Sequence, residues 1–315
     1  MTNLTIGVDL GGTNVRVAVV AENGVILKEF IRKTEASKGP EFVINNLIEM
    51  IKNLLEDFRV QDQDTRIQSI GIGCPGPLDP YRGVILSPPN LPGWDEVPLV
   101  SLLQQHFSLP IALDNDANAA SLAEATLGAG VGHKSIYYIT WSTGVGGGLV
   151  IDGKIFKGAQ GCAGEIGNMI IQPNGFLYSN LNAGALEALA SGTAIGREGK
   201  ARIGIQGGAE EVFQLAEQGH AEALAIIEEA VDFLAIGIAN LVHSINPEVF
   251  VLGGGVMQSK DLVYELLCKK VRSYVYPSLQ NQIIIKPVEL GTKAGIVGAA
   301  LLPLKQGRQG DGSDQ

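Results

Sequence analysis

Asp9, Gly11, Gly12, Thr13 and Asn14 stand at the bend between two runs of alternating apolar residues near the N-terminus. Such runs predict two strands joined by a tight turn. Glycines let backbone N–H groups approach an anion closely, and a nearby carboxylate can hold the magnesium ion that accompanies a nucleotide. The pattern therefore predicts a phosphate-binding turn.

The same arrangement recurs within residues 135–154, where Thr143, Gly144 and Gly146 follow an apolar run. A third glycine turn, which contains Gly254 and Gly255, follows the apolar residues 249–252. An ordinary hairpin turn would explain any one of these segments. Three such turns, each at the end of an apolar strand and one preceded by an aspartate, favour a nucleotide gripped by a duplicated architecture.

Two competing nucleotide motifs can be checked directly. The chain contains no GxxxxGK[ST] segment, which a P-loop requires. The glycines at 144–148 are followed by strand residues, whereas a dinucleotide fingerprint continues into a helix. Neither motif explains the glycine turns.

A polar cluster, residues 114–118, joins an apolar run at 111–113 to an alanine-rich segment that ends near Leu127. This pattern predicts a strand followed by a helix, and ligands of open α/β sheets collect at such junctions. A carboxylate placed there can align and deprotonate a hydroxyl group, which makes Asp116 the candidate base. The alternative for Asp116 is a helix N-cap, a role that Asp114 or Asn115 could fill instead.

The composition argues against several classes of protein: general nucleic-acid binders, disulfide-rich proteins and membrane-spanning proteins. A formal net charge of −10 argues against general nucleic-acid binding, which needs a basic surface. The three cysteines are too widely spaced for a disulfide framework or a CxxC metal site, which favours a reducing cytoplasm. No apolar run has the length of a membrane span, so we expect a cytoplasmic protein with small-molecule partners.

In this order and at these separations, the motifs resemble those of the ROK family of sugar kinases, and among them most closely the bacterial glucokinases. The resemblance runs from about Leu4 to Leu302. The segments that carry it are 9–14 (DLGGTN), 87–94 (SPPNLPGW), 114–118 (DNDAN), 142–148 (STGVGGG), 164–167 (GEIG), 186–187 (LE) and 252–255 (LGGG).

The resemblance implies an α/β protein with a two-lobed actin/hexokinase-like (ribonuclease H-like) fold and a central cleft. It implies a smaller domain at 1–117 plus about 297–315, a larger domain at 118–296, and a homodimer. The implied reaction is ATP-dependent phosphorylation of glucose at the 6-hydroxyl group, with Mg-ATP as the donor and Asp116 as the general base.

The resemblance also assigns the remaining site residues. Asn90, Asn115, Glu165, Asn168 and Glu187 are expected to bind the sugar, since amides and carboxylates satisfy its hydroxyl groups. Asp9 is expected to act through magnesium. The expected nucleotide-binding set comprises Gly11, Gly12, Thr13 and Asn14 of the first turn, Thr143, Gly144 and Gly146 of the second, and Gly254 and Gly255 near the nucleoside.

One departure from the family concerns a structural zinc site, which most members build from one histidine and three cysteines. The corresponding positions here are Asn168, Tyr178, Asn180 and Ala185. Asparagine and tyrosine are poor zinc ligands and alanine is none, so we expect no bound zinc. In place of the metal, we expect Phe176, Leu177, Tyr178 and Leu181 to pack the loop.

Several alternatives stay open at this stage. The substrate could be fructose, mannose, allose or N-acetylmannosamine, and the donor could be polyphosphate. The related sugar-responsive repressors carry an added helix-turn-helix ahead of the first strand, whereas only three residues precede Leu4 here. A sugar sensor without catalysis is the third alternative, and an intact Asp116 disfavours it.

Overall fold

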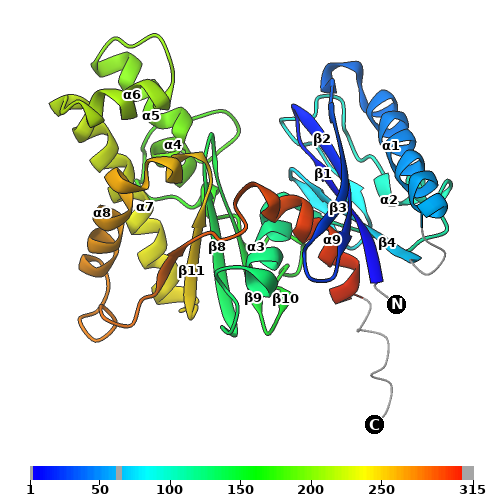
Figure 1. Ribbon diagram of the computed structural model, residues 1–315. Helices are drawn as coiled ribbons and strands as arrows, with labels where there is room; N and C mark the ends of the chain where they lie inside the picture. The colour runs from blue at the N-terminus through cyan, green and yellow to red at the C-terminus, as the bar shows by residue number, and fades with distance from the viewer. Residues whose placement is uncertain (1–2, 62–65, 307–315) are drawn as a thin grey trace. The chain divides into compact units, whose positions relative to one another are not determined.

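The computed structural model describes residues 3–61 and 66–306, which form two compact units (Figure 1). Unit 1 takes residues 1–131, 149–163 and 292–315 as far as they are described, and unit 2 takes residues 132–148 and 164–291. The sequence-based boundary at residue 117 falls at the start of a helix that belongs wholly to unit 1. That helix, α3 (Asp116–Leu127), packs closely on α9 (Ala294–Gln306) of the same unit.

Unit 1 contains a five-stranded sheet in the order β3-β2-β1-β4-β7. The strands β1 (Asn3–Leu10), β2 (Asn14–Ala21) and β3 (Ile26–Lys33) are antiparallel neighbours. On the other side of β1, β4 (Arg66–Cys74) and β7 (Ile111–Asn115) run parallel to it. The predicted strand, glycine turn and returning strand are thereby confirmed as β1 and β2.

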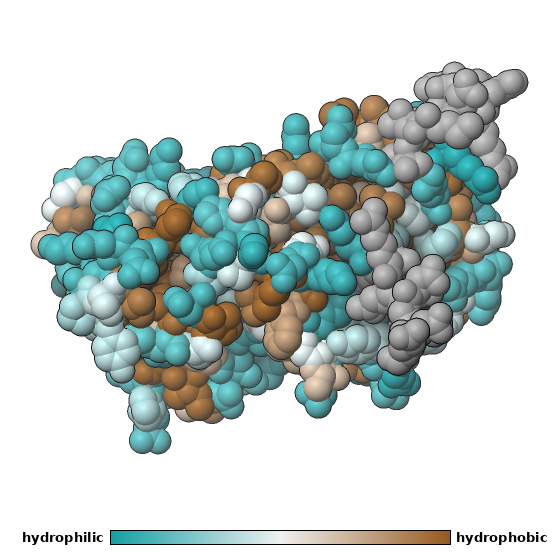
Figure 2. All heavy atoms as spheres, turned by 90° about the horizontal axis from the view of Figure 1, so that it is seen from below, coloured by the Kyte–Doolittle hydropathy of each residue, from teal (hydrophilic) through white to brown (hydrophobic). Residues whose placement is uncertain are grey.

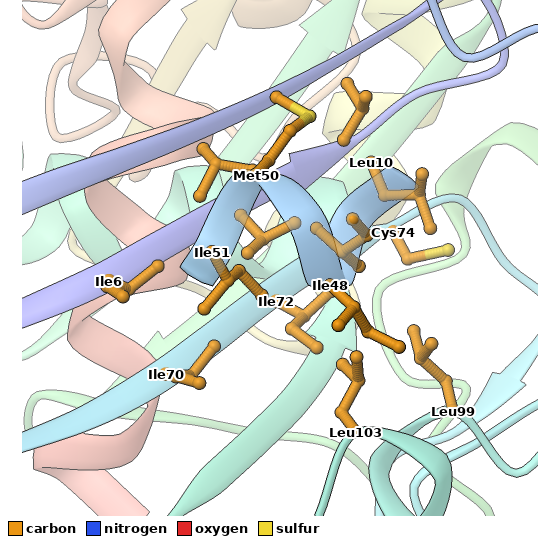
Figure 3. Close-up of a cluster of buried hydrophobic side chains, with 14 of the residues drawn as sticks. Ile6, Leu10, Ile48, Met50, Ile51, Ile70, Ile72, Cys74, Leu99 and Leu103 are labelled. Carbon is orange, nitrogen blue, oxygen red and sulfur yellow. The ribbon is translucent and has the colours of Figure 1, made fainter. Parts of the chain in front are cut away.

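Successive side chains along each strand of unit 1 point to opposite faces of the sheet, and the two faces differ in composition. Ile6, Leu10, Ile70 and Ile72 point into a buried cluster with α1 (Pro40–Gln61) and α2 (Leu99–Gln104), as Figure 3 shows. These side chains are almost completely removed from water, which is the main source of stability for such a layer. The intervening residues, which include Asp9, face the opposite side.

That opposite face carries glycines in place of a second apolar row. A Cβ atom at Gly7 would lie 2.4 Å from the carbonyl oxygen of Ile296, and one at Gly71 would overlap the carbonyl of Ala299. The helix α9 therefore packs directly on the backbone of β1 and β4.

Unit 1 also contains a short ribbon and one 3-10 helix, and a second 3-10 helix starts at the last residue of unit 2 and continues into unit 1. The ribbon pairs β5 (Leu78–Asp79) with β6 (Val84–Ile85). The 3-10 helices are η1 (Ala36–Lys38) and η4 (Gly291–Lys293), the latter leading into α9. The proline-rich segment 87–94 forms no regular element.

The second sheet has the order β10-β9-β8-β11-β12. Its strands are β8 (Ser135–Trp141), β9 (Val145–Ile151), β10 (Lys154–Ile155), β11 (Val249–Gly253) and β12 (Ile285–Pro287). The strand β11 runs parallel to both β8 and β12. The second predicted glycine hairpin is confirmed as β8 and β9.

The helices of unit 2 gather around α7 (Ala221–Ser244), which contacts four others. These are α4 (Leu186–Ala190), α5 (Gly192–Arg202), α6 (Ala209–Glu217) and α8 (Lys260–Ser273). Two 3-10 helices, η2 (Ile166–Asn168) and η3 (Gly255–Ser259), complete the unit. The sequence analysis contains no prediction for α5, α6 or α8.

Within the described part of the chain, no helix combines the length and the hydrophobicity that a membrane crossing requires. On the face that Figure 2 presents, hydrophobic residues lie in separate groups between hydrophilic ones.

Candidate active site

The predicted site residues fall into two groups, one in each unit. In unit 1, the turn between β1 and β2 is closed by a hydrogen bond of 3.0 Å from the Gly11 N–H to the Asn14 carbonyl. The buried Thr34 clamps this turn from outside, because its hydroxyl donates to the Gly11 carbonyl at 2.5 Å and its N–H donates to the Thr13 carbonyl at 2.9 Å. Thr13 and Asn14 remain exposed, which leaves them accessible to a ligand.

Asn90 lies against the same turn. A Cβ atom at Gly12 would stand 2.7 Å from the Asn90 carbonyl oxygen and 3.0 Å from the Asn90 Cβ. The loop that carries Asn90 is anchored by Leu91 and Trp94, which are both buried, whereas Asn90 itself is exposed. The absence of a side chain at Gly12 therefore brings the predicted sugar ligand Asn90 next to the predicted phosphate turn.

Three neighbouring parallel strands place two carboxylates in one row. Asp9 of β1 pairs with Gly73 of β4, and Gly73 pairs with Asp114 of β7. Residues in register point to the same face of a sheet, so Asp9 and Asp114 flank Gly73 at about 5 Å per strand. A Cβ atom at Gly73 would lie 3.7 Å from the Cα of Asp116, which places Asp116 above the gap between the two carboxylates.

The environment of Asp9 disfavours its negative charge. The pKa of Asp9 is raised from 3.8 to about 6, chiefly by burial and next by the charge of Asp116, while Arg16 opposes the shift. Arg16 is itself held by Glu29 and by the Thr292 carbonyl. The neighbourhood of Asp9 therefore has an excess of negative charge, which a divalent cation would relieve.

Asp116 begins helix α3, and Asn115 is the N-cap of that helix. The Asn115 Oδ1 accepts hydrogen bonds from the N–H groups of Ala117 at 2.8 Å and Asn118 at 3.4 Å. Asp116 Oδ1 also accepts from the Ala117 N–H at 2.8 Å, and its side chain stays exposed. The capping role thus falls to Asn115, and the carboxylate of Asp116 remains accessible for chemistry.

The surrounding protein raises the pKa of Asp116 by limiting its hydration, while the Ala117 N–H acts in the opposite direction. Because the side chain is exposed, water screens part of this effect. A carboxylate with a raised pKa is a stronger proton acceptor than an ordinary aspartate.

In unit 2, the turn Ser142–Gly144 is tied to the start of α5. The Gly192 N–H donates to the Ser142 carbonyl at 2.7 Å, and the Thr193 hydroxyl donates to the Thr143 carbonyl at 2.8 Å. Thr143 itself is exposed. The helix α5 is capped by Ser191, whose hydroxyl accepts from the Ala194 N–H at 3.1 Å.

A cavity of about 670 Å³ opens beside this turn, wholly within unit 2. Its walls come from the turn, the first residues of α5, one face of α6 and the 3-10 helix η3. The lining residues are Ser142, Thr143, Gly192, Thr193, Gly208, Ala209, Glu210, Phe213, Gln214, Glu217, Gly255, Val256, Gln258 and Ser259. The volume is within the range of small-molecule and cofactor sites.

The third glycine turn closes one side of this region. Gly254 has a φ of 95°, and a Cβ atom there would lie 2.3 Å from the Trp141 carbonyl oxygen. Only glycine fits this combination of left-handed backbone and close approach. Glycine at position 254 therefore allows η3, whose first residue is Gly255, to pack closely against the end of β8.

The carboxylate of Glu187 also supports the second turn. Its Oε2 accepts a hydrogen bond of 2.9 Å from the Val145 N–H, and a Cβ atom at Gly144 would lie 2.5 Å from the same oxygen. Gly167 lies on the other side, where a Cβ would be 3.4 Å from Oε2. Glu187 of α4 thus joins the turn Ser142–Gly144 to the segment that carries Glu165 and Asn168, both of which are exposed.

Asn168 closes the loop that would hold zinc in the family pattern. Its Oδ1 accepts a hydrogen bond of 2.8 Å from the Asn182 N–H, and its carbonyl accepts one of 3.4 Å from the Asn182 side chain. Backbone bonds from Ile171 to the Gly184 carbonyl and from Gly184 to the Phe176 carbonyl, both 2.9 Å, complete the closure. A polar clip therefore occupies the position where the sequence analysis expects an apolar one.

The expected apolar packing of this loop is wrong for three of its four residues. The exposed fractions are 45% for Phe176, 64% for Leu177 and 37% for Tyr178. Phe176 is covered on one face by the guanidinium of Arg197, which lies 3.9 Å from the ring centroid. Backbone hydrogen bonds already hold the loop, so its side chains need not form a core.

Among the described residues, no three or more His, Cys, Asp and Glu side chains form a group suited to a metal ion. The expected absence of zinc stays a prediction. Two contacts near the candidate site were not predicted from the sequence: the ion pair of Asp114 with Lys157 and the hydrogen bonds between Asn168 and Asn182. Neither partner is close in sequence, so no local pattern could have identified it.

Comparison with known proteins gives consistent matches over nearly the whole chain. The sequence pattern described as ROK family matches residues 5–306. A glucokinase of Thermotoga maritima is 37% identical over 309 residues, which cover 94% of this chain and 95% of that enzyme. A xylose repressor of Bacillus spizizenii is 28% identical, and the match covers 96% of this chain and 77% of the repressor.

Solved structures agree with this result. The ROK hexokinase of Thermus thermophilus has a TM-score of 0.86 and 35% identity, with 96% of this chain and 99% of that chain covered. A ROK family glucokinase of Streptomyces griseus, in complex with glucose and AMPPNP, has a TM-score of 0.78 and 31% identity, with 94% and 98% covered. The fold is therefore that of the actin/hexokinase-like sugar kinases, as the sequence predicts.

Proposed function

Because this chain belongs to the ROK family and is a sugar kinase of that family, we propose that it transfers the terminal phosphoryl group of ATP to the 6-hydroxyl group of glucose. The single observation that carries the proposal is the placement of Asp116. This exposed carboxylate with a raised pKa stands at a strand-to-helix junction, above Gly73 and next to the row that contains Asp9.

In the proposed reaction, Asp116 accepts the proton of the attacking hydroxyl group. Its Oδ1 is oriented by the Ala117 N–H, so the second oxygen is the one we assign to the sugar. Asn115 caps α3 through Oδ1 and can offer its amide N–H₂ to a neighbouring hydroxyl. General-base catalysis of this kind typically contributes about 10²- to 10⁴-fold in rate.

The carboxylate of Asp9 can bind a magnesium ion. The described side chains do not form a group of three or more ligands, so the other ligands of the ion would come from water and the substrate phosphates. Burial and the nearby charge of Asp116 raise the pKa of Asp9, so a bound cation would favour the charged carboxylate. Magnesium usually keeps several waters and binds through one or two carboxylates together with substrate phosphates. When bound with ATP, the ion would neutralise charge on the phosphates; Gly11, Gly12, Thr13 and Asn14 would present backbone and side-chain donors to them.

In unit 2, we assign the 670 Å³ cavity to the nucleoside, because Thr143 and Gly255 line it. Gly144 and Gly146 follow Thr143 in the chain and are assigned to the phosphates, and Gly254 precedes Gly255 and is assigned to the nucleoside. Phe213 is buried in the wall and offers an apolar surface to a base. Glu165, Asn168 and Glu187, together with Asn90 of unit 1, are the residues we assign to the remaining sugar hydroxyls.

The same cavity favours a nucleotide over polyphosphate as donor. Glu210 and Glu217 line it from one face of α6, and no lysine or arginine is among the described residues that line it. A long polyanion would meet two negative charges and no cation there. We therefore expect ATP to exceed polyphosphate in kcat/KM by at least 100-fold.

The test is a panel of glucose, fructose, mannose, allose and N-acetylmannosamine with ATP and with polyphosphate, ranked by kcat/KM. Glucose with ATP should rank first, and Asp116→Asn should lower kcat by about 10²- to 10⁴-fold while glucose still binds. Another hexose in first place would correct the substrate. An Asp116→Asn enzyme with more than a few per cent of the normal kcat would remove Asp116 from the role of base.

A regulator is the second candidate, because xylose repressors match the same residues. A regulator of this fold would bind a sugar without ADP formation. Measuring ADP release with each sugar of the panel separates the two functions. We also propose a homodimer, which sedimentation at several concentrations would test.

A further inference from the structure

Asp114 is a fully buried carboxylate two residues before the proposed base. Its Oδ1 accepts two hydrogen bonds of 2.9 Å, one from the Asn115 N–H and one from the Asn118 side-chain amide. Both donors belong to the start of α3, which carries Asp116 between them. The orientation of the Asp114 carboxylate therefore determines where this turn of backbone lies.

The second oxygen of Asp114 faces a cation. Lys157 Nζ lies 2.9 Å from Asp114 Oδ2, and the lysine side chain is only 13% exposed. The same Oδ2 has no partner in hydrogen-bond geometry among the described residues, so the contact is an ion pair without hydrogen-bond directionality. An ion pair at this distance in a buried place is strongly coupled, because little water screens it.

Two hydrogen bonds fix the backbone at Lys157 and Gly158, and one aromatic ring lies near the ammonium group of Lys157. The Ala163 N–H donates to the Lys157 carbonyl at 2.9 Å and closes the loop that follows the lysine. The Tyr81 ring centroid lies 5.7 Å from the ammonium group, and the Tyr81 hydroxyl donates to the Gly158 carbonyl at 2.8 Å. The lysine is thus a fixed charge and not a mobile surface group.

We propose that Lys157 is a positioning residue for phosphoryl transfer: through its ion pair with Asp114 it fixes the strand-to-helix junction that carries Asp116. The proposal rests on the proposed function, because it assigns Lys157 to the support of the base and not to contact with the sugar or the nucleotide. An error in position of about 1 Å at a reacting group can cost about 100-fold in rate.

The experiment compares Lys157→Met, Lys157→Arg and a matched control, Lys154→Met, in the full chain. Lys154 belongs to the same segment but is exposed. We expect Lys157→Met to lower kcat by 10- to 100-fold, with the KM values for glucose and ATP within threefold of wild type. Lys157→Arg should recover at least a third of the normal kcat, and Lys154→Met should leave it unchanged.

A second variant separates positioning from stability, because Lys157→Met leaves a buried carboxylate unpaired and should lower Tm. The double variant Asp114→Asn/Lys157→Met removes both charges. We expect its Tm to recover while its kcat stays at least fivefold low. A full recovery of kcat would show that the pair only balances charge, and would overturn the proposal.

The outcomes also distinguish this proposal from the proposed function. If Asp116→Asn abolishes turnover but folded Lys157→Met keeps the normal kcat, only the role of Lys157 is wrong. If Asp116→Asn keeps the normal kcat, both the base and its positioning are wrong. If Lys157→Met raises KM and leaves kcat unchanged, Lys157 acts in substrate binding and the positioning role is overturned.

Discussion

The two glycine hairpins share a sequence pattern but differ in what surrounds them. Asp9 lies on β1, two residues before the first turn begins at Gly11. The equivalent position on β8, two residues before the second turn begins at Ser142, is Thr140. The first turn is clamped by the buried Thr34, whereas the second is tied to Glu187 and to the start of α5. The comparison teaches that two similar glycine turns are held by different neighbours, and we propose that these neighbours decide whether a metal ion or a nucleoside binds beside the turn.

The largest expected effect tests the carboxylate that distinguishes the first hairpin. Asp9→Asn should lower kcat by about 100-fold or more, because the residue assigned to magnesium loses its charge. Thr140→Val, the matched change in the second hairpin, should alter kcat by less than threefold. Steady-state kinetics over a magnesium titration measures both. Equal losses in the two variants would remove the functional difference between the hairpins.

The same Asp9→Asn variant should be more stable than wild type at high pH when magnesium is absent. The folded-state pKa of Asp9, about 6, exceeds its ordinary value of 3.8, so the folded state binds this proton more tightly than the unfolded state. The stability linked to protonation is complete below pH 3.8 and is lost as pH rises through 6.

Replacing Asp9 with asparagine should therefore increase the free energy of unfolding by about 1 to 3 kcal/mol at pH 8 relative to wild type, and the gain should disappear near pH 3.5. Urea unfolding at a series of pH values measures the difference. A gain that is the same at pH 4 and pH 8 would contradict the raised pKa.

A third prediction concerns the support of the second turn. Glu187→Ala should lower the free energy of unfolding by about 1 to 2 kcal/mol, because the Val145 N–H loses its acceptor. Glu187→Gln keeps an acceptor oxygen and should lose less than half as much. Both variants should raise the KM for glucose if Glu187 also binds the sugar. Thermal unfolding together with kinetics separates these two roles, and equal stability losses would argue against the hydrogen bond.

The smallest expected effects come from the two threonines, Thr34 and Thr193, whose hydroxyl groups donate hydrogen bonds to the first and the second turn. Thr34→Val should cost about 1 kcal/mol of stability, because the buried Thr34 loses its part-buried hydrogen bond to the Gly11 carbonyl. Thr193→Val, which removes the bond to the Thr143 carbonyl nearer the surface, should cost about 0.5 kcal/mol or less. Chemical denaturation resolves such differences. The reverse order would show that the second turn is the more tightly held of the two.

The sequence predicted those parts of the site that depend on neighbouring residues. The two hairpins and the junction at Asn115 and Asp116 follow from alternation, glycine turns and an alanine-rich helical segment, all of which lie within short stretches of sequence. Contacts between distant segments were not predicted. Asp114 and Lys157 are 43 residues apart and Arg16 and Thr292 are 276 apart, so the pairs form only when the chain folds.

The loop after Asn168 shows the same limit. Four missing ligands in the sequence led to the prediction that zinc is absent, but the sequence did not identify what holds the loop. We expected apolar packing because aromatic residues are abundant there, whereas the structure uses hydrogen bonds between Asn168 and Asn182 and a backbone ladder. Backbone donors occur at almost every residue, so composition cannot indicate which of them will pair.

By itself, the sequence determined the strand and helix periods, the positions of the three glycine turns and the identity of the acidic residue at the head of α3. Only the tertiary structure decided that Asp9, Gly73 and Asp114 stand in one row, that Asn115 takes the cap, and that Lys157 neutralises Asp114. The physical reason is the distance along the sequence over which each kind of interaction acts. Turn and helix preferences act over a few residues, whereas strand register and ion pairing depend on where distant segments meet.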